Sequence, residues 1–328
     1  MRVVLQQNTD PAFNLAFEEY ALTRWKEGVV AILWRNERSV IIGRNQNAYA
    51  EIDLDYVARE QIAVIRRLTG GGAVFHDLGN INFTFLSDYE KGQFGSYQQF
   101  AKPVCDFLKT LGLTAEVSGR NDILADGVKI SGNAQTVQDG RILQHGTLLY
   151  SADLSRMAAA LRPRPLKMQS RGIRSVRSRV GNIQSLCNCA LTAQDFLQQL
   201  YHYLLQMPDA EAYIPTEQDN LEVERLRNEK YGRWEWNFGQ SPNMNFTREE
   251  KYPFGLLQLT LSVQGGRISN VLLQGDFFGL RPVEELCAAL ENIPYERKVL
   301  CAALETLQVE EYVSGMKMQD LIELLGAS

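Results

Sequence analysis

Three consecutive glycines, Gly70, Gly71 and Gly72, follow a pair of arginines in the stretch RRLTGGGAVFHD at residues 66–77. Glycine lets backbone N–H groups approach an anion closely, and arginine supplies charge and paired donors for phosphate or carboxylate. The stretch lacks the lysine-serine or lysine-threonine pair of a Walker loop, and a strand is expected after it rather than the helix of a dinucleotide fingerprint. From these residues alone, a phosphate cradle and a glycine-rich hairpin with surface arginines both remain open.

Two strand-like segments carry polar groups that could complete such a site. In VKISGNAQ, the two-residue alternation of a strand places Lys129 and Ser131 on one face and the apolar residues on the other. Lysine is usually a solvated surface residue, but a lysine on a strand can also point into a cleft. His145 begins HGTLL in an apolar segment, where it is either a structural histidine or a general acid or base, and the same two interpretations apply to His76.

A basic segment at residues 162–179 carries seven arginine or lysine side chains and few large apolar ones. It is therefore expected to be an irregular, solvent-accessible loop. Such a loop could be simply solvated, close over a nucleotide phosphate, dock an acidic protein or bind RNA. The net charge of −5 counts against a protein that coats nucleic acid, although a local basic patch can still serve one phosphate-bearing ligand.

Length and composition predict a globular protein with more than one domain. The chain has 328 residues, against roughly 150 for an average domain, and its 45% hydrophobic and 22% charged content is ordinary. The N-terminus resembles no secretory signal and no stretch is long and apolar enough to span a membrane, so a cytoplasmic protein is expected. The five cysteines form no CxxC pair, and Cys187 and Cys189 are too close for an ordinary zinc half-site, so structural thiols without disulfides are expected.

The elements that must position these groups alternate between strands and helices. Asp10 and Pro11 suit the start of a helix that ends near Gly28. Strands are predicted at residues 29–34 and 39–43, joined as a hairpin, and at 63–68, 73–77, 80–87, 114–119, 121–126, 128–137 and 142–151, with helices at 54–60, 97–111 and 192–205.

A domain boundary is expected near residue 246, which gives a main domain at residues 1–245 and a smaller one at 246–328. In the smaller domain, two strands turn at Gly265 and Gly266. Helices are expected there at residues 283–290 and 312–325, which makes a small α+β module.

Together, the motifs closely resemble those of the lipoate-protein ligases. RRLTGGGAVFHDLGN, GRNDI, KISGNAQ, HGTLL and SVRSRV stand in the order and spacing of that family, and FNLAFEE, LWRN, IGRNQN and WEWNFGQ extend the likeness over nearly the whole chain. The resemblance implies an α+β fold. A large catalytic domain of mixed, mainly antiparallel sheets with helices, like that of biotin and lipoate ligases, would carry a small α+β accessory domain.

The chemistry that the resemblance implies is a two-step reaction that depends on ATP and Mg²⁺. The carboxylate of lipoate attacks the α-phosphate of ATP to give lipoyl-AMP and pyrophosphate, and the ε-amine of an acceptor lysine then attacks the mixed anhydride and expels AMP. The acceptors would be lipoyl domains of 2-oxoacid dehydrogenase E2 subunits and the glycine-cleavage H protein, with no nucleic-acid or membrane partner.

The resemblance also assigns roles to individual residues. Lys129 would be the catalytic residue, with an ammonium that contacts both lipoate and ATP and offsets the charge developing in both steps. Further ATP contacts would come from Arg67, Gly72, Ala73, Val74 and Phe75. Besides Lys129, lipoate would be bound by Leu15, Trp34, Gly70, Gly71 and His145. Asp122 would help to place Mg²⁺ or the incoming lysine, and the loop that closes over the adenylate would comprise Arg174, Ser175, Val176, Arg177, Ser178, Arg179 and Val180.

Two rival hypotheses stand beside this one. An octanoyl or lipoyl transferase of the same fold would use a cysteine thiolate and no ATP, but none of the five cysteines lies in the glycine-rich, lysine or histidine motifs. A nonenzymatic protein that binds nucleic acid or an effector would use the basic segment at residues 162–179. The acidic net charge and the lack of an aromatic RNA-binding motif count against it.

Overall fold

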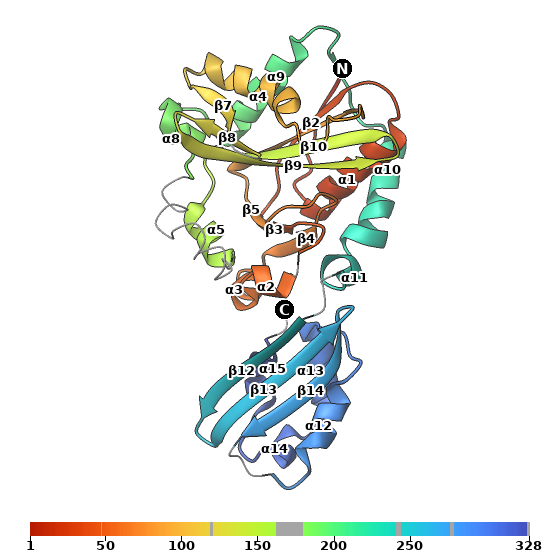
Figure 1. Cartoon of the computed structure of the whole chain (residues 1–328), viewed down its shortest axis with the longest axis vertical. Helices are drawn as coiled ribbons and strands as arrows, with labels where there is room; N and C mark the ends of the chain where they lie inside the picture. Colours follow the sequence, from red (N-terminus) through yellow and green to blue (C-terminus); the bar gives the residue numbers. More distant parts are fainter. Residues whose placement is uncertain (47, 119–120, 162–179, 241–243, 276–278, 327–328) are drawn as a thin grey trace. The chain divides into compact units, whose positions relative to one another are not determined.

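The computed structural model describes residues 1–46, 48–118, 121–161, 180–240, 244–275 and 279–326 (Figure 1). By their contacts the residues form two compact units. One comprises Met1–Arg44 and Ile62–Arg233, and the other comprises Asn45–Gln61 and Trp234–Ser328. The domain limits expected from the sequence, 1–245 and 246–328, remain a prediction; the division by contacts places residues 45–61 and 234–245 in the second unit.

A mixed sheet is the frame of the first unit. In the part of the chain that the structure describes, it has eight strands in the order β11-β1-β2-β6-β10-β9-β8-β7. The strands are β1 (Arg2–Leu5), β2 (Val30–Trp34), β6 (Asn80–Asp88), β7 (Ala115–Ser118), β8 (Asp122–Ala125), β9 (Val128–Gln138), β10 (Arg141–Leu149) and β11 (Glu211–Ala212). β1 is parallel to β2 and β11, whereas the other pairs are antiparallel. The predicted mixed, mainly antiparallel architecture is therefore confirmed.

A smaller sheet in the same unit joins β3 (Ser39–Ile42) to β4 (Ala63–Arg66) and β5 (Val74–His76). The predicted hairpin between residues 29–34 and 39–43 is wrong, because β2 and β3 belong to different sheets. β2 is buried along its whole length and is already paired with β1 on one edge and β6 on the other. No edge of β2 is left to pair with β3, so the chain passes into the second sheet.

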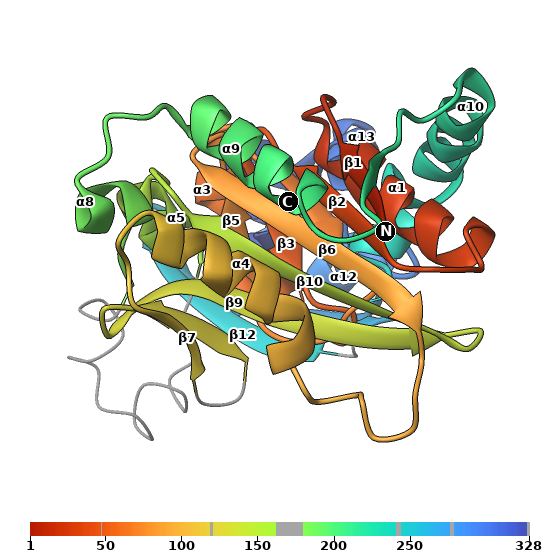
Figure 2. The same cartoon turned by 90° about the horizontal axis from the view of Figure 1, so that it is seen from above.

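Helices cover both faces of the large sheet. Figures 1 and 2 show α4 (Gln98–Thr110) and α9 (Ala193–Leu205) over one face and α1 (Pro11–Arg24) on the opposite face. α1 begins as predicted, since the Asp10 side chain accepts hydrogen bonds from the first backbone N–H groups of the helix. The other helical segments of this unit are α5 (Leu154–Ala160), α8 (Ile183–Cys187), α10 (Glu217–Leu226) and the π-helix η1 (Arg227–Tyr231).

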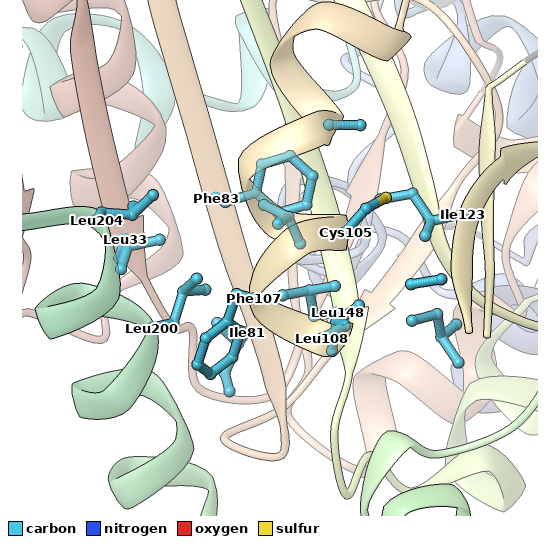
Figure 3. Packing of buried hydrophobic residues seen from close by; sticks show 14 of the residues in the cluster. Leu33, Ile81, Phe83, Cys105, Phe107, Leu108, Ile123, Leu148, Leu200 and Leu204 are labelled. Atoms are coloured by element: carbon cyan, nitrogen blue, oxygen red, sulfur yellow. The ribbon is translucent and has the colours of Figure 1, made fainter. Parts of the chain in front are cut away.

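The main core lies between the large sheet and the pair α4 and α9 (Figure 3). Alternate residues of the strands point into it, as the two-residue period of a strand requires. The core residues labelled in Figure 3 are Leu33, Ile81, Phe83, Cys105, Phe107, Leu108, Ile123, Leu148, Leu200 and Leu204. The intervening strand residues therefore face α1 and the small sheet, where polar side chains gather.

Truncation of this core should lower stability. Leu148 on β10 is fully buried, so Leu148→Ala is expected to reduce the free energy of unfolding by about 3 kcal/mol, because methylene groups leave the core and a cavity remains. Urea denaturation followed by circular dichroism measures the change. Leu221→Ala is the matched control, since Leu221 on α10 is 59% exposed. Equal losses in the two variants would contradict the prediction.

The second unit contains a three-stranded antiparallel sheet, counted over its described residues: β12 (Met244–Tyr252), β13 (Gly255–Gln264) and β14 (Arg267–Gly275). The predicted turn at Gly265 and Gly266 is confirmed, and both glycines have positive φ angles. Its helices are α2 (Ala48–Glu51), α3 (Leu54–Arg59), α11 (Trp234–Asn237), α12 (Val283–Leu290), α13 (Arg297–Glu305), α14 (Val309–Tyr312) and α15 (Met318–Leu325). The helix expected at residues 312–325 is interrupted near Gly315, where φ is also positive.

The cysteines differ from the expectation of free thiols. The prediction that disulfides are absent is wrong, because Cys187 and Cys189 are bonded to each other. α8 ends at Cys187 and Asn188 adopts the left-handed conformation, which turns the chain so that the two cysteine Cα atoms lie 5.1 Å apart. Among the described helices, none is long and apolar enough to cross a membrane.

Candidate active site

A cavity of about 200 Å³ lies between α1, the large sheet, the small sheet and the glycine loop. Nine of the residues that the sequence assigned to ligands line it: Leu15, Trp34, Arg67, Gly71, Gly72, Ala73, Val74, Lys129 and His145. Phe75 and Gly70 do not line it. Phe75 is a buried residue of β5, and the Gly70 carbonyl accepts a hydrogen bond from Arg67. The structure thus brings the glycine motif, the lysine motif and the histidine motif to one place.

A row of side chains across four strands forms the floor of the cavity. Trp34 on β2 is paired with Asn82 on β6, and Asn82 is paired with Thr147 on β10. The backbone N–H of Gly132 on β9 donates to Thr147 Oγ1 at 3.3 Å, which continues the row. A Cβ at Gly132 would lie 4.0 Å from Lys129 Nζ, so the ammonium is at the end of this row opposite Trp34.

Lys129 is ion-paired at that end. Its Nζ lies 2.8 Å from Asp122 Oδ1, and both side chains are about one-third exposed. Val180 forms a parallel bridge with Lys129, and the backbone N–H of Gly181 donates to the Lys129 carbonyl at 3.1 Å. The end of the predicted adenylate loop therefore reaches the lysine. The other six residues of that loop, 174–179, lie outside the described residues.

Arg67 organises the glycine loop. Its Nε donates to Thr69 Oγ1 at 2.9 Å, and Nη2 donates to the carbonyls of Gly70 at 2.7 Å and Gly72 at 2.9 Å. A further bond joins Nη1 to the carbonyl of Ile41 at 3.0 Å, so four of the five guanidinium N–H groups are used. Burial lowers the pKa of Arg67 to about 10, which keeps the group charged at neutral pH. Its contact with ATP stays a prediction, and its contact with the loop backbone is direct.

Glu18, which the sequence did not identify, connects Trp34 to the glycine loop through hydrogen bonds. His145 Nδ1 lies 3.0 Å from Glu18 Oε1, and His145 Nε2 lies 2.8 Å from Thr69 Oγ1. Thr84 Oγ1 donates to Glu18 at 2.5 Å and accepts from Trp34 Nε1 at 2.9 Å. A continuous chain of buried hydrogen bonds therefore joins Trp34 to Thr69, to which Arg67 also donates a hydrogen bond.

His76 is also buried against the cavity. Desolvation lowers its pKa to about 3, and the nearby positive charge of Arg67 acts in the same direction, followed by His145. Its Nδ1 lies 3.1 Å from Asn36 Nδ2. The ring is therefore neutral at any pH at which the protein is expected to work, and general acid catalysis by an imidazolium at this position is not supported.

The depressed pKa of His76 predicts a loss of stability in acid. Unfolded histidine has a pKa near 6.5, so between pH 6.5 and about 3 the unfolded chain binds the extra proton. The stability that the neutral His76 contributes is fully present above pH 6.5. It is lost as pH falls, so the free energy of unfolding at pH 5 is lower by about 2 kcal/mol. Unfolding free energies at pH 7 and pH 5 measure it: His76→Gln should shrink the difference, whereas His202→Gln, at an exposed position, should not. An unchanged difference in His76→Gln would refute the prediction.

The cysteines are remote from this chemistry. Among the residues described, which include all five cysteines, none lines the cavity. Cys105 is part of the main core, where burial raises the pKa of its thiol to about 11 and disfavours the nucleophilic thiolate. A transferase mechanism through a cysteine thiolate is therefore unsupported here.

Known proteins are similar to this chain in sequence and in fold. The chain matches the lipoyl protein ligase A/B catalytic domain family at residues 10–205 and the bacterial lipoate protein ligase C-terminus family at residues 241–325. It is 39% identical to the lipoate-protein ligase LplJ of Bacillus subtilis (strain 168), over 98% of each chain.

Two solved structures resemble about three-quarters of the chain. The bipartite lipoate-protein ligase of Thermoplasma acidophilum, described with its E2 lipoyl domain, is 29% identical, with a TM-score of 0.65 over 73% of this chain and 96% of that one. A lipoate-protein ligase A bound with ATP is 29% identical, with a TM-score of 0.63 over 73% of this chain and 98% of that one. With two family matches and a relative similar over its full length, this chain belongs to the lipoate-protein ligase family and is an enzyme of that kind.

Proposed function

We propose that this enzyme activates lipoate with ATP to form lipoyl-AMP and then transfers the lipoyl group to a lysine ε-amine of an acceptor protein. One observation carries the proposal: the Lys129 ammonium, the backbone of residues 71–74 and the apolar side chains of Leu15 and Trp34 line a single cavity. An ammonium suits a carboxylate and a phosphate, glycine backbone suits phosphate oxygens, and the apolar side chains suit an alkyl chain.

In the first step, a carboxylate oxygen of lipoate bonds to the α-phosphorus of ATP, and the bond from that phosphorus to pyrophosphate breaks. Lys129 lies where its ammonium can hold both anionic reactants and offset the charge that builds on them. In the second step, the acceptor amine bonds to the acyl carbon, AMP leaves, and the amine loses a proton. The relative bound with ATP supports the nucleotide as the activating substrate.

Mg²⁺ would enter with ATP. Within the described residues there is no cluster of three or more metal-ligating side chains, and Asp122 is the carboxylate beside Lys129. This donor set fits Mg²⁺, which is commonly held by one or two carboxylates, substrate phosphates and water. Bound there, the ion would neutralise phosphate charge, while Asp122 would orient the ion or the Lys129 ammonium.

The proposed acceptors are the lipoyl domains of 2-oxoacid dehydrogenase E2 subunits and the glycine-cleavage H protein. The Thermoplasma acidophilum relative is described together with its E2 lipoyl domain, which supports the first class. The proposed closure of residues 174–180 over the adenylate would protect the anhydride from water during the acceptor's approach.

Mass spectrometry of the purified enzyme tests the proposal. Incubation with ATP, Mg²⁺ and lipoate should yield lipoyl-AMP and pyrophosphate, and addition of an E2 lipoyl domain should produce the lipoylated domain and AMP. Omission of ATP is the control and should stop both steps. Transfer from octanoyl carrier protein without ATP would instead favour the thiolate transferase.

A further inference from the structure

Two buried polar atoms in the wall of the cavity have no hydrogen-bond partner among the described residues. They are His76 Nε2 and Asn82 Nδ2, on side chains that are 3% and 2% exposed. Both residues line the cavity, as do the apolar side chains of Leu15 and Trp34. A buried polar atom without a partner is costly, so its position against a ligand cavity indicates that a ligand atom completes it.

The surrounding hydrogen bonds identify His76 Nε2 as a donor. Asn14 Nδ2 donates to the carbonyls of Asn8 at 2.9 Å and Arg35 at 3.0 Å, which fixes the orientation of the Asn14 amide. Asn36 Oδ1, at 2.9 Å from the same nitrogen, is a third acceptor that shares the two amide hydrogens, so Asn36 turns its own Nδ2 toward His76 Nδ1. His76 Nδ1 is thus the acceptor, and the hydrogen of the neutral ring is on Nε2.

Asn82 supplies a second donor. Its Oδ1 accepts from Asn80 Nδ2 at 2.9 Å, which leaves the Asn82 amide hydrogens for the cavity. Both donors lie beside Trp34. The ring centroids of His76 and Trp34 are 6.1 Å apart, and Asn82 is the strand partner of Trp34. The two donors therefore gather at one end of the cavity.

Lys129 lies at the other end. Asn82 is on β6 and Lys129 on β9, with β10 between them, so two strand spacings of about 4.8 Å separate the strands. The Lys129 side chain reaches back to Gly132, the end of the row that contains Asn82, because a Cβ at Gly132 would lie 4.0 Å from Lys129 Nζ. A ligand with its carboxylate at Lys129 would present its far end to His76 and Asn82.

We propose that His76 and Asn82 are specificity-determining residues, which donate N–H···S hydrogen bonds to the dithiolane sulfurs and so select lipoate over octanoate. This inference rests on the proposed function, because it requires the carboxylate at Lys129. Sulfur in such a ring is a weak acceptor, whereas the terminal methyl group of octanoate accepts no hydrogen bond and leaves both donors unpaired. A site built around hydrogen-bond donors disfavours an analogue that lacks the acceptor.

Three acids separate the contribution of sulfur from that of shape. They are lipoate, octanoate and 5-cyclopentylpentanoate, which keeps the five-membered ring but has no sulfur. ATP-dependent formation of each acyl-AMP gives kcat/KM, and calorimetry without ATP gives the Kd of each acid. The wild-type enzyme is expected to prefer lipoate to the cyclopentyl acid by about tenfold. In Asn82→Leu and His76→Phe, this ratio should fall toward one.

Asn133→Leu is the matched control. Asn133 also lines the cavity, but its amide hydrogens are already bonded to the Asn121 carbonyl at 3.1 Å and to Ser131 Oγ at 3.2 Å. Its substitution should change kcat/KM for all three acids together and leave the ratio near the wild-type value. Thermal melting of each variant shows whether it is folded.

The outcomes distinguish this inference from the proposed function. If the wild type forms lipoyl-AMP but treats the cyclopentyl acid equally, the inference is wrong and the proposed function stands. If the wild type activates and binds none of the acids, both are wrong. Equal losses for all three acids in folded His76→Phe would place the donors at the carboxylate and overturn the inference. If a variant does not fold, the wild-type comparison alone decides.

Discussion

Lys129→Ala is expected to lower the rate of lipoyl-AMP formation about a thousandfold. The ammonium lines the cavity beside Asp122, and alanine removes the cation that would hold the carboxylate and the α-phosphate together. Loss of one preorganised donor to developing charge commonly costs a hundredfold to a thousandfold, and two anionic reactants meet here. Release of pyrophosphate with saturating ATP and lipoate measures the rate.

Two further variants separate position from charge. Lys129→Arg keeps the positive charge but changes its shape, so it should recover only a small part of the rate. Lys102→Ala removes a lysine that is ion-paired to Asp106 on the outer surface of α4, and it should have the wild-type rate. A normal rate in Lys129→Ala would remove this lysine from the mechanism and leave the proposed function without its main support.

Local patterns predicted the elements on which the cavity residues lie. The alternation in VKISGNAQ predicted a strand that carries Lys129, and β9 is that strand. The shared face predicted for Lys129 and Ser131 is wrong, because a bulge separates them and the buried Ser131 pairs with Ile123 of the core. The combination of Asp10 and Pro11 located the start of α1, and Thr192 caps α9 at the expected position. Each of these signals depends on neighbouring residues alone, which is why the sequence was sufficient.

The partners of those residues depend on strand pairing and were not predictable. Glu18 is a glutamate in a helix, and such a residue is normally exposed. The signal that could have identified it is its place one turn after Asn14 and Leu15, on the face of α1 that is buried. Its bonds to His145 and Thr84 come from two strands more than sixty residues away in sequence, and only the register of β6 and β10 brings them to α1.

Arg67 shows the same limit for a predicted ligand contact. Its position beside the glycines suggested a phosphate donor, but four of its N–H groups bond to the loop and to β3. In the structure it acts first as a positioning residue, because it sets where the carbonyls of Gly70 and Gly72 point. The loop backbone that lines the cavity at Gly71 and Gly72 is therefore positioned by a buried cation.

Gly43→Ala is expected to lower kcat/KM for ATP about a hundredfold by displacing the glycine loop. A Cβ at residue 43 would lie 2.2 Å from the Gly71 carbonyl oxygen, a distance that no packing tolerates. Residue 43 cannot retreat, since the neighbouring Ile42 and Arg44 are bonded through their backbones to Arg67 at 3.0 Å and Thr69 at 2.8 Å. The tip of the loop must move instead, and a shift near 1 Å at a reacting site costs about this much.

Gly79→Ala is the matched control for that experiment. Its Cβ would meet the Ser151 carbonyl oxygen at 2.3 Å, an equally severe clash, but Gly79 and Ser151 do not line the cavity. Both variants should melt at a lower temperature than the wild type, and only Gly43→Ala should lose most of its activity per folded molecule. If both variants lose activity equally, the loss comes from general destabilisation. The position of the glycine loop would then have no special part in binding ATP.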